Sequence, residues 1–151
     1  MPEKETLRRA RRDKRQGKSA STQAGEFVRE EIEHIREGKH GARSTEQAIA
    51  IGLSKARRAG VKLEAPKKGE ASRSTRRKAR ADLEAGRKTG AKHTSRRRGR
   101  AVERALKKEP RRTASKKALS RHAKKAARKR PASNRRAAAR KAARTRKRRS
   151  S

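Results

Sequence analysis

The sequence predicts a mostly α-helical protein. We expect a short N-terminal helical hairpin, followed by a basic tail that has no extended core and is largely disordered or helical only on binding. Two stretches with apolar residues at helical spacing predict the hairpin. Only 28% of the 151 residues are hydrophobic, and 52 Lys and Arg outnumber 15 Asp and Glu, which gives a net charge of +37. Chains of this kind bury too little apolar surface to offset their conformational entropy.

The charge is unevenly distributed along the chain. Residues 1–70 hold 18 basic and 11 acidic side chains (+7), whereas residues 71–151 hold 34 and 4 (+30), and together they make the +37 of the whole chain. A weakly charged front with a polycationic back is typical of a module that carries an interaction tail. We therefore divide the chain into a basic N-terminal arm (1–18), the helical hairpin (20–63) and the polycationic tail (66–151).

The arm is predicted to be helical from Glu3 to Gln16, because this stretch consists of good helix formers and has no Gly or Pro before Gly17. Leu7 and Ala10 are nearly its only apolar residues. The arm is therefore either a solvated helix or a segment whose six basic residues between positions 8 and 15 bind phosphates.

The hairpin is predicted to contain two helices. The first starts at Ser21 or Thr22, either of which can cap it, and the second starts at a capping box formed by Ser44 and Gln47. Gly60 suits the left-handed residue that ends the second helix. Apolar residues recur at i, i+4 and i+7 in both helices. The predicted hairpin core comprises Phe27, Val28, Ile32, Ile35, Ile49 and Leu53.

A hairpin of this size is close to the lower limit for independent folding, which is about 40 residues without metals, disulfides or oligomerisation. The chain has no Cys, so it has no disulfide and no thiolate metal site. We therefore expect residues 20–63 either to self-associate into a bundle or to be marginally stable alone.

The tail repeats a small polar residue followed by two basic residues at intervals of about 20 residues. The repeats begin at Thr75, Ser95, Ser115 and Asn134. Each is predicted to be a helix cap that precedes a helix rich in Ala, Arg and Lys. The predicted breaks lie at Gly86, Gly90, Pro110 and Pro131. The repeat reflects either designed units or compositional drift, and the tail has too few large apolar residues for a core between units.

Polyanions are the expected partners of the tail, because Lys and Arg that neutralise phosphates release condensed counterions. Duplex DNA with weak sequence preference is favoured over RNA, since Phe27 is the only Phe, Trp or Tyr available to stack on an unpaired base. A membrane partner is not expected, because the tail lacks apolar anchors. The candidate contact residues are Arg76, Arg77, Arg96, Arg97, Arg98, Lys116, Lys117, Lys124, Lys125, Arg135, Arg136, Arg148 and Arg149, with Lys39 and Arg43 as further candidates.

Lys39 and Arg43 are candidates because of the Gly-flanked segment 38–41, which joins the two hairpin helices. This segment is either a turn that needs Gly for its backbone angles or a loop whose amides hold a phosphate at a helix N-terminus.

Metal, cofactor and enzyme functions are not predicted. His34 follows Glu30 and Glu31 at helical spacing, which is half of a Glu-x-x-His carboxylate site, and the other half is missing. The remaining histidines are scattered at His40, His93 and His122. The chain has no nucleophile elbow, P-loop or Rossmann glycine pattern.

The segments STQAGEFVREEI (21–32), HIREGKHGARS (34–44) and QAIAIGLSKARRAG (47–60) resemble a family of small basic bacterial proteins that carry an uncharacterised domain of unknown function. The resemblance implies a bacterial source and transfers no activity. The Lys-, Arg- and Ala-rich tail is similar in composition to bacterial linker-histone-like tails.

The sequence therefore predicts a histone-like, nucleoid-associated protein that binds DNA without sequence specificity, by neutralising and bridging phosphates. One alternative is an RNA- or ribosome-associated basic protein. Another is an adaptor that uses the acidic face of the first hairpin helix to dock a protein partner. Because no apolar leader or membrane-length apolar run is present, we expect the protein in the cytoplasm, on the nucleoid.

Overall fold

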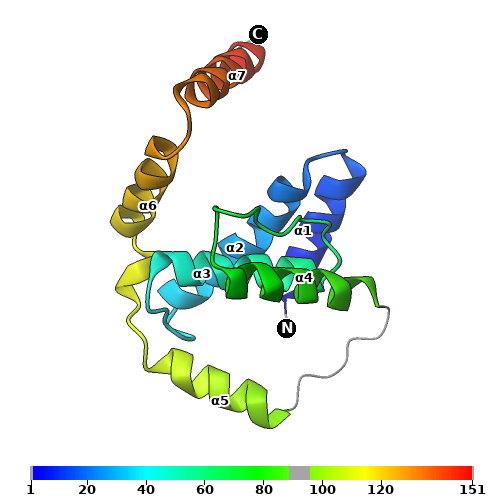
Figure 1. Ribbon diagram of the computed structural model, residues 1–151, viewed down its shortest axis with the longest axis vertical. Helices are drawn as coiled ribbons and strands as arrows, with labels where there is room; N and C mark the ends of the chain where they lie inside the picture. The colour runs from blue at the N-terminus through cyan, green and yellow to red at the C-terminus, as the bar shows by residue number, and fades with distance from the viewer. Residues whose placement is uncertain (1, 89–95, 151) are drawn as a thin grey trace. The chain divides into compact units, whose positions relative to one another are not determined.

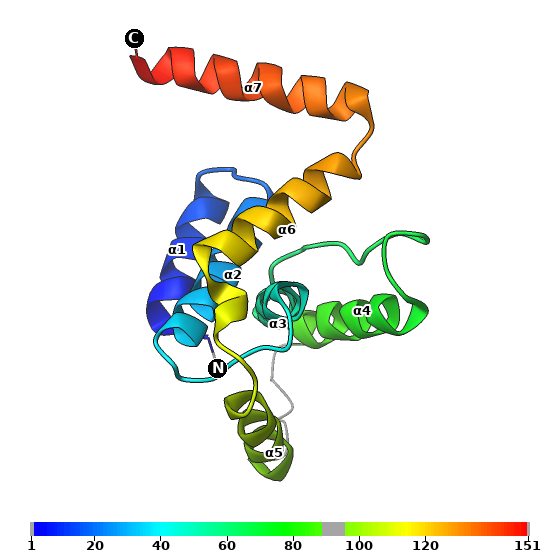
Figure 2. The same ribbon diagram turned by 90° about the vertical axis from the view of Figure 1, so that its left-hand side faces the viewer.

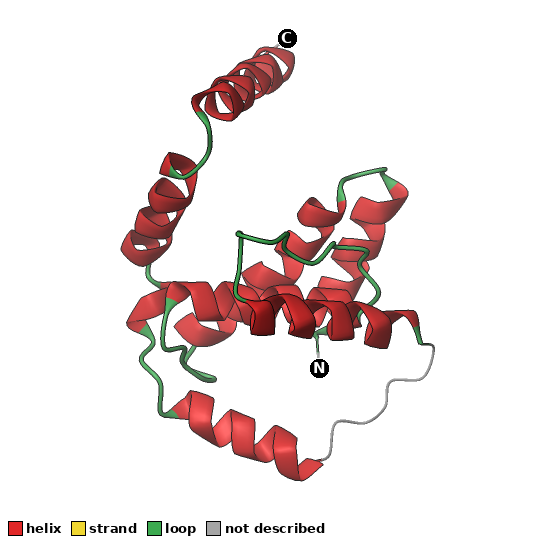
Figure 3. Cartoon of the chain, in the orientation of Figure 1, coloured by secondary structure: helices red, strands yellow, loops and turns green. Residues whose placement is uncertain are grey.

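The computed structural model describes residues 2–88 and 96–150, apart from the side chains of residues 96, 149 and 150. Within these ranges the chain forms seven α-helices, one short 3-10 helix and no β-strand (Figures 1 and 3). The helices are α1 (Lys4–Arg15), α2 (Ala20–Arg36), α3 (Thr45–Arg58), α4 (Arg73–Arg87), α5 (Arg96–Lys107), η1 (Arg112–Ala114), α6 (Lys116–Arg128) and α7 (Ala132–Ser150). The chain divides into two compact units, Met1–Ser115 and Lys116–Ser151.

This architecture corrects the predicted fold class. The first unit is a compact multi-helix fold in which α1 packs on α2, α2 on α3 and α3 on α4 (Figure 2). The arm and the first part of the tail therefore complete the hairpin, and the rest of the described tail is helical where we predicted a largely disordered chain. The composition argument failed because small residues and paired charges supply the packing that we expected only from large apolar side chains.

The N-terminal arm is part of the core. Thr6, Ala10 and Asp13 are buried on one face of α1. Ala10 joins a core cluster with Ala24, Phe27, Ala56 and Val61, around which Leu7, Ala20, Leu53 and Leu63 are partly buried. Because α1 and α4 cover the hairpin, its small size no longer gives a reason to expect self-association.

Helices α2 and α3 pack more closely than the predicted apolar stripes require. Of the predicted core residues, Phe27, Ile32 and Ile35 are buried, whereas Val28, Ile49 and Leu53 are half-buried. The buried face of α3 instead carries Ala48, Gly52 and Ala56, spaced by four residues. A Cβ at Gly52 would lie only 2.6 Å from the Cα of Val28. The helices therefore meet through a stripe of small residues.

Helix α4 packs on α3 through a glycine and a buried carboxylate. A Cβ at Gly86 would collide with the carbonyl oxygen of Arg57, so the two backbones are in contact there. Asp82 is 3% exposed. Its carboxylate accepts hydrogen bonds from Ser54 Oγ at 2.6 Å and from Arg58 Nε at 2.7 Å. A buried carboxylate is tolerated here because it is paired with a cation and hydrogen-bonded.

The hairpin helix boundaries largely follow the predicted capping chemistry. Ser44 caps α3 and accepts a hydrogen bond from the backbone N–H of Gln47 at 3.1 Å. Gly60 has φ +89°, which confirms the left-handed stop. The start of α2 was predicted two to three residues late, because Ser19 caps this helix and places Thr22 in its first turn.

The tail caps are less regular than the predicted repeat. Ser115 directly precedes α6, whereas Thr75 and Asn134 lie inside helices, and Ser72 caps α4. Pro110 and Pro131 separate helices as predicted, but Gly86 lies within α4. Ser95 and Gly90 lie outside the described residues.

Candidate functional site

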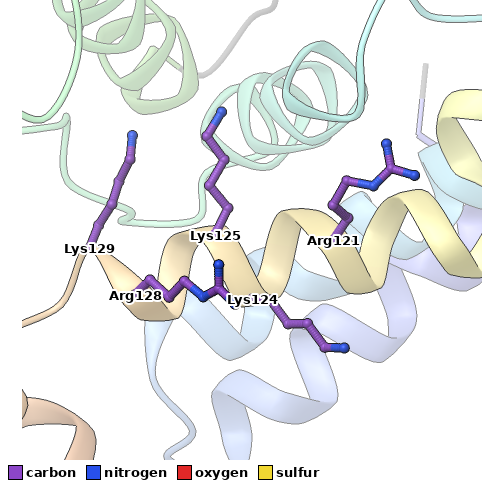
Figure 4. Close-up of a pocket in the computed structure, with 5 residues that line it drawn as sticks. All are labelled: Arg121, Lys124, Lys125, Arg128 and Lys129. Carbon is purple, nitrogen blue, oxygen red and sulfur yellow. The ribbon is translucent and has the colours of Figure 1, made fainter.

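One cationic surface of the second unit lies on α6. Five basic side chains surround a surface pocket on this helix (Figure 4): Arg121, Lys124, Lys125, Arg128 and Lys129. Their spacing of i, i+3, i+4, i+7 and i+8 places them on one helix face. We call this set the α6 stripe. Residues 116–151 contain 17 Lys and Arg and no Asp or Glu, so the stripe has no acidic neighbour along its own segment.

A second pocket in the first unit has a similar lining. It is bordered by Lys4, Leu7, Arg8, Arg11 and Arg15, which share one face of α1. Acidic residues lie nearer to this face, because Arg8 Nη2 lies 2.5 Å from Glu5 Oε2. The α1 surface is therefore less strongly cationic than the α6 stripe.

The charge density of the α6 stripe approaches that of a nucleic acid. Eight residues of α-helix rise about 12 Å, so the five cations lie within about that length. Duplex DNA carries about seven phosphates over the same axial distance. The stripe can therefore neutralise most of the phosphates that it spans, and each neutralised phosphate releases counterion.

Most of the predicted contact residues are exposed. These are Arg77, Arg97, Arg98, Lys116, Lys117, Lys124, Lys125, Arg135, Arg136 and Arg148. Arg76 is half-buried, and its Nε is buried without a hydrogen-bond partner. The side chains of Arg96 and Arg149 lie outside the described part of the structure. Sequence reasoning missed Arg121, Arg128 and Lys129, although basic residues at i, i+3, i+4 and i+7 would have indicated the stripe.

The Gly-flanked loop between α2 and α3 is a turn, because its backbone amides are already hydrogen-bonded. Gly38 has φ +80°, and its N–H bonds to the Ile35 carbonyl. The N–H of Lys39 bonds to His34 O at 3.0 Å, and that of Gly41 to Leu106 O at 2.8 Å. A phosphate would have to displace these carbonyl acceptors, and this leaves Lys39 and Arg43 without the predicted amide cradle.

The same loop is held by the segment that follows α5. A Cβ at Gly41 would collide with the carbonyl of Glu109. Thr113 Oγ1 donates to Ala42 O at 3.2 Å, and Thr45 Oγ1 donates to Thr113 O at 2.7 Å. The start of α3 and the segment around η1 are thus joined by backbone and side-chain hydrogen bonds.

Beside this loop, α2 carries two buried carboxylates. Glu30 and Glu31 are 2% and 1% exposed. Glu30 Oε2 accepts the backbone N–H of Glu3 at 3.0 Å. Lys55 Nζ lies 2.6 Å from Glu31 Oε2 and 3.5 Å from Glu30 Oε1. Oε2 of Glu31 nevertheless has no partner with hydrogen-bond geometry, so its contact with Lys55 is an ion pair only.

Two histidines complete this cluster. His40 Nε2 lies 3.2 Å from Glu31 Oε1, and His34 Nε2 lies 2.8 Å from Glu3 Oε1. The hydrogen bond from His34, followed by that from Lys39, lowers the pKa of the Glu3 carboxyl. His40 was predicted to be a scattered residue, but the turn at Gly38 brings it back to α2. Because that reversal depends on a tertiary contact, helical spacing alone could not reveal it.

The acidic face of α2, which the adaptor hypothesis requires, is partly occupied by the fold. Glu30 and Glu31 are buried, and Glu26 accepts from Arg9 of α1 at 2.6 Å. Glu33 and Glu37 stay 45% and 58% exposed, in surface ion pairs with Arg29 and Lys39, so only this smaller acidic surface is left for a partner.

No family model, curated protein or solved structure matches this chain. The resemblance to small basic bacterial proteins therefore stays a prediction. None of the helices in the described ranges is long and apolar enough to span a membrane.

Proposed function

We propose that the protein binds duplex DNA without sequence specificity, as a histone-like, nucleoid-associated protein. The observation that carries this proposal is the α6 stripe, within a unit of 17 basic and no acidic residues. Among the residues of this unit whose burial is described, none is buried. Its basic side chains are therefore not part of a hydrophobic core.

Counterion release supplies the binding energy in this proposal. It depends on the number of phosphates neutralised and does not depend on the base sequence. Arg side chains can also enter a narrow minor groove, which adds a preference for groove shape without base readout. Weak sequence preference follows from both effects.

Bridging is supported by the presence of basic helix faces in both units. Lys4, Arg8, Arg11 and Arg15 lie on α1, whereas the α6 stripe lies beyond Ser115. A chain with two separate cationic faces can contact phosphates of two duplexes, or two parts of one duplex. The α1 face is expected to contribute less, because Glu5 already pairs with Arg8.

The test is fluorescence anisotropy with scrambled 30-bp duplexes between 50 and 500 mM salt. We expect log K to fall linearly with log salt, with a slope of about −0.9 for each phosphate contact. The matched variant replaces Lys124, Lys125 and Arg128 by Gln and should have a shallower slope. An affinity that does not change over this salt range would refute the electrostatic mechanism.

Competition with structured RNA separates the proposed function from its main alternative. Phe27 is the only Phe, Trp or Tyr, and it is buried in the core, so no aromatic platform is exposed for unpaired bases. We expect duplex DNA to compete at least as well as a hairpin RNA of equal charge. A large preference for the RNA would favour an RNA- or ribosome-associated role.

A further inference from the structure

We propose that Glu31, His34 and His40 form a structural site for a transition-metal dication, with Zn²⁺ as the expected ion. Each residue offers one ligand atom, and these atoms all lie within 4.8 Å of one another. Two imidazoles and a carboxylate are a donor set that Zn²⁺ takes in proteins. The site is independent of the DNA-binding proposal, because it lies in the first unit and uses none of the basic stripe residues.

The contacts of the two ring nitrogens of His40 are the strongest indication of a metal site. Its Nδ1 lies 3.0 Å from the carbonyl oxygen of Gly41, which can only accept, so Nδ1 carries the hydrogen. In a neutral ring, Nε2 then has a lone pair, and it faces Glu31 Oε1 at 3.2 Å. Two lone pairs face each other at this distance, and a metal ion between them would be coordinated by both.

The Nδ1 contact of His40 is also the one expected of a metal-binding histidine. Such a ring usually donates its other N–H to a carbonyl or carboxylate, which fixes its tautomer and orientation. The Gly41 carbonyl does this for His40, and the Glu3 carboxylate lies 2.8 Å from His34 Nε2. Glu3 is therefore a positioning residue for His34.

Glu31 provides a second, independent observation. This carboxylate is 1% exposed, and its Oε2 has no hydrogen-bond partner. Lys55 supplies the nearest positive charge to Oε2, at 2.6 Å, and it also lies 3.5 Å from Glu30. A buried carboxylate with an incomplete set of partners gains from a further cation.

The local charge also favours a cation, although the whole chain is strongly basic. Four carboxylates (Glu3, Glu30, Glu31 and Glu37) meet here with the ammonium groups of Lys39 and Lys55 and with the guanidinium of Arg111, which lies against Gly38. The carboxylates exceed these cations by one, and a dication would offset that excess.

The geometry requires a small closure of the site. Tetrahedral Zn²⁺ with bonds of 2.0–2.1 Å holds its ligand atoms about 3.4 Å apart, so the widest pair would approach by at most about 1.4 Å. The side chains of His34 and His40 are 14% and 13% exposed, and His40 lies in the loop between α2 and α3. Because both histidines are partly exposed, a water molecule can take the fourth coordination position of the ion.

Binding would fasten that loop to α2. The loop in turn holds the segment after α5, since the Gly41 N–H donates to Leu106 O at 2.8 Å. An ion that bridges His40 to Glu31 and His34 is therefore expected to stabilise the first unit against unfolding.

The test uses the full chain, purified with a chelator and titrated with ZnCl₂ against a competing chromogenic chelator. We expect one equivalent to bind and a rise in the thermal midpoint. His34→Asn and His40→Asn should each weaken binding at least about tenfold and abolish that rise. His122→Asn, a histidine of α6, is the matched control and should leave both unchanged.

A second measurement needs no variant and covers the case in which a substitution unfolds the chain. In the wild-type protein, ¹⁵N-detected ring signals of His34 and His40 should shift with one equivalent of Zn²⁺, while that of His122 stays in place. The proposal is overturned if no zinc binds, if the His34→Asn and His40→Asn variants bind zinc as tightly as His122→Asn, or if the His34 and His40 rings do not shift.

Discussion

The two units of the chain use positive charge in opposite ways. The first unit, up to Ser115, has 35 basic and 15 acidic residues, and its buried acids are paired: Asp13 with Lys18, Glu31 with Lys55 and Asp82 with Arg58. The second unit has 17 basic residues and no acidic one. Where acidic partners exist, the cations help to build a fold, and where the segment has no acidic residue the described basic side chains stay exposed, as the proposed DNA binding requires.

The units also differ in packing. The first is assembled from close helix contacts at Gly52 and Gly86 and from a small core around Phe27. Helix α6 has no buried residue, and the described side chains of α7 are all exposed. Stability should therefore depend mainly on the first unit, and the proposed DNA binding mainly on the second.

Removal of residues 116–151 should produce the largest effect. It deletes 17 of the 52 basic residues and leaves the compact first unit. We expect duplex affinity at 50 mM salt to fall by more than about a hundredfold, and the salt slope to lose several units. Anisotropy titrations measure both quantities, and circular dichroism should show that the remaining unit melts as before. If residues 1–115 bind DNA as tightly as the whole chain, the assignment of binding to the second unit is wrong.

Gly52→Val should have the next largest effect, on stability. The new side chain would meet the backbone of Val28, where even a Cβ would lie 2.6 Å from the Cα. Overpacking of this kind costs about 1–3 kcal/mol. The matched control is Gly25→Ala on α2, because nothing lies within 4 Å of a Cβ there. That change should stabilise the protein by about 0.5–1 kcal/mol, since Ala is the better helix former. Urea unfolding measures the change in unfolding free energy for each variant. Changes of the same sign for Gly52→Val and Gly25→Ala would contradict the close contact of α2 and α3.

Asp82→Asn should reduce stability by a similar amount. The buried carboxylate would lose its charge opposite Arg58 and at least part of its bonding to Ser54. Disruption of a charge-assisted hydrogen bond of this kind costs about 1.5–3 kcal/mol at most. Glu84→Gln, on an exposed site of the same helix, should change the unfolding free energy by less than about 0.5 kcal/mol. Similar losses for the two variants would argue against the buried pairing of α4 with α3.

Local chemistry was predictable from the sequence, and the partners of each helix were not. The cap at Ser44 and the left-handed stop at Gly60 could be predicted, because both depend only on neighbouring residues in the chain. Arg57 shows the opposite case. It is buried, donates to the carbonyls of Leu63 and Glu64, and has its pKa lowered by burial, with Asp82 opposing the shift. That role depends on the path of the chain after α3, which no local pattern encodes.

The same distinction explains what was missed at the candidate sites. The α6 stripe depends only on helical spacing, so it could have been found by counting basic residues along one helix face. The cluster of Glu31 and His40 depends on how a loop folds back onto α2. The disordered tail was predicted from average composition, which does not show that Asp82 and Gly86 are placed to hold α4 against α3.

The smallest expected effect compares single charges in the two units. Lys125→Gln in the α6 stripe should make the salt slope shallower by about 0.9, the value for one phosphate contact on duplex DNA. Arg9→Gln on α1 removes the same charge, but Arg9 is already paired with Glu26 at 2.6 Å, so the slope should hardly change. Arg9→Gln should instead lower the free energy of unfolding in urea, because the α1–α2 ion pair is lost. Lys125→Arg keeps the charge and should keep the slope. Equal slope changes for Lys125→Gln and Arg9→Gln would mean that net charge alone governs binding, whether or not a cation is paired with a carboxylate of the fold.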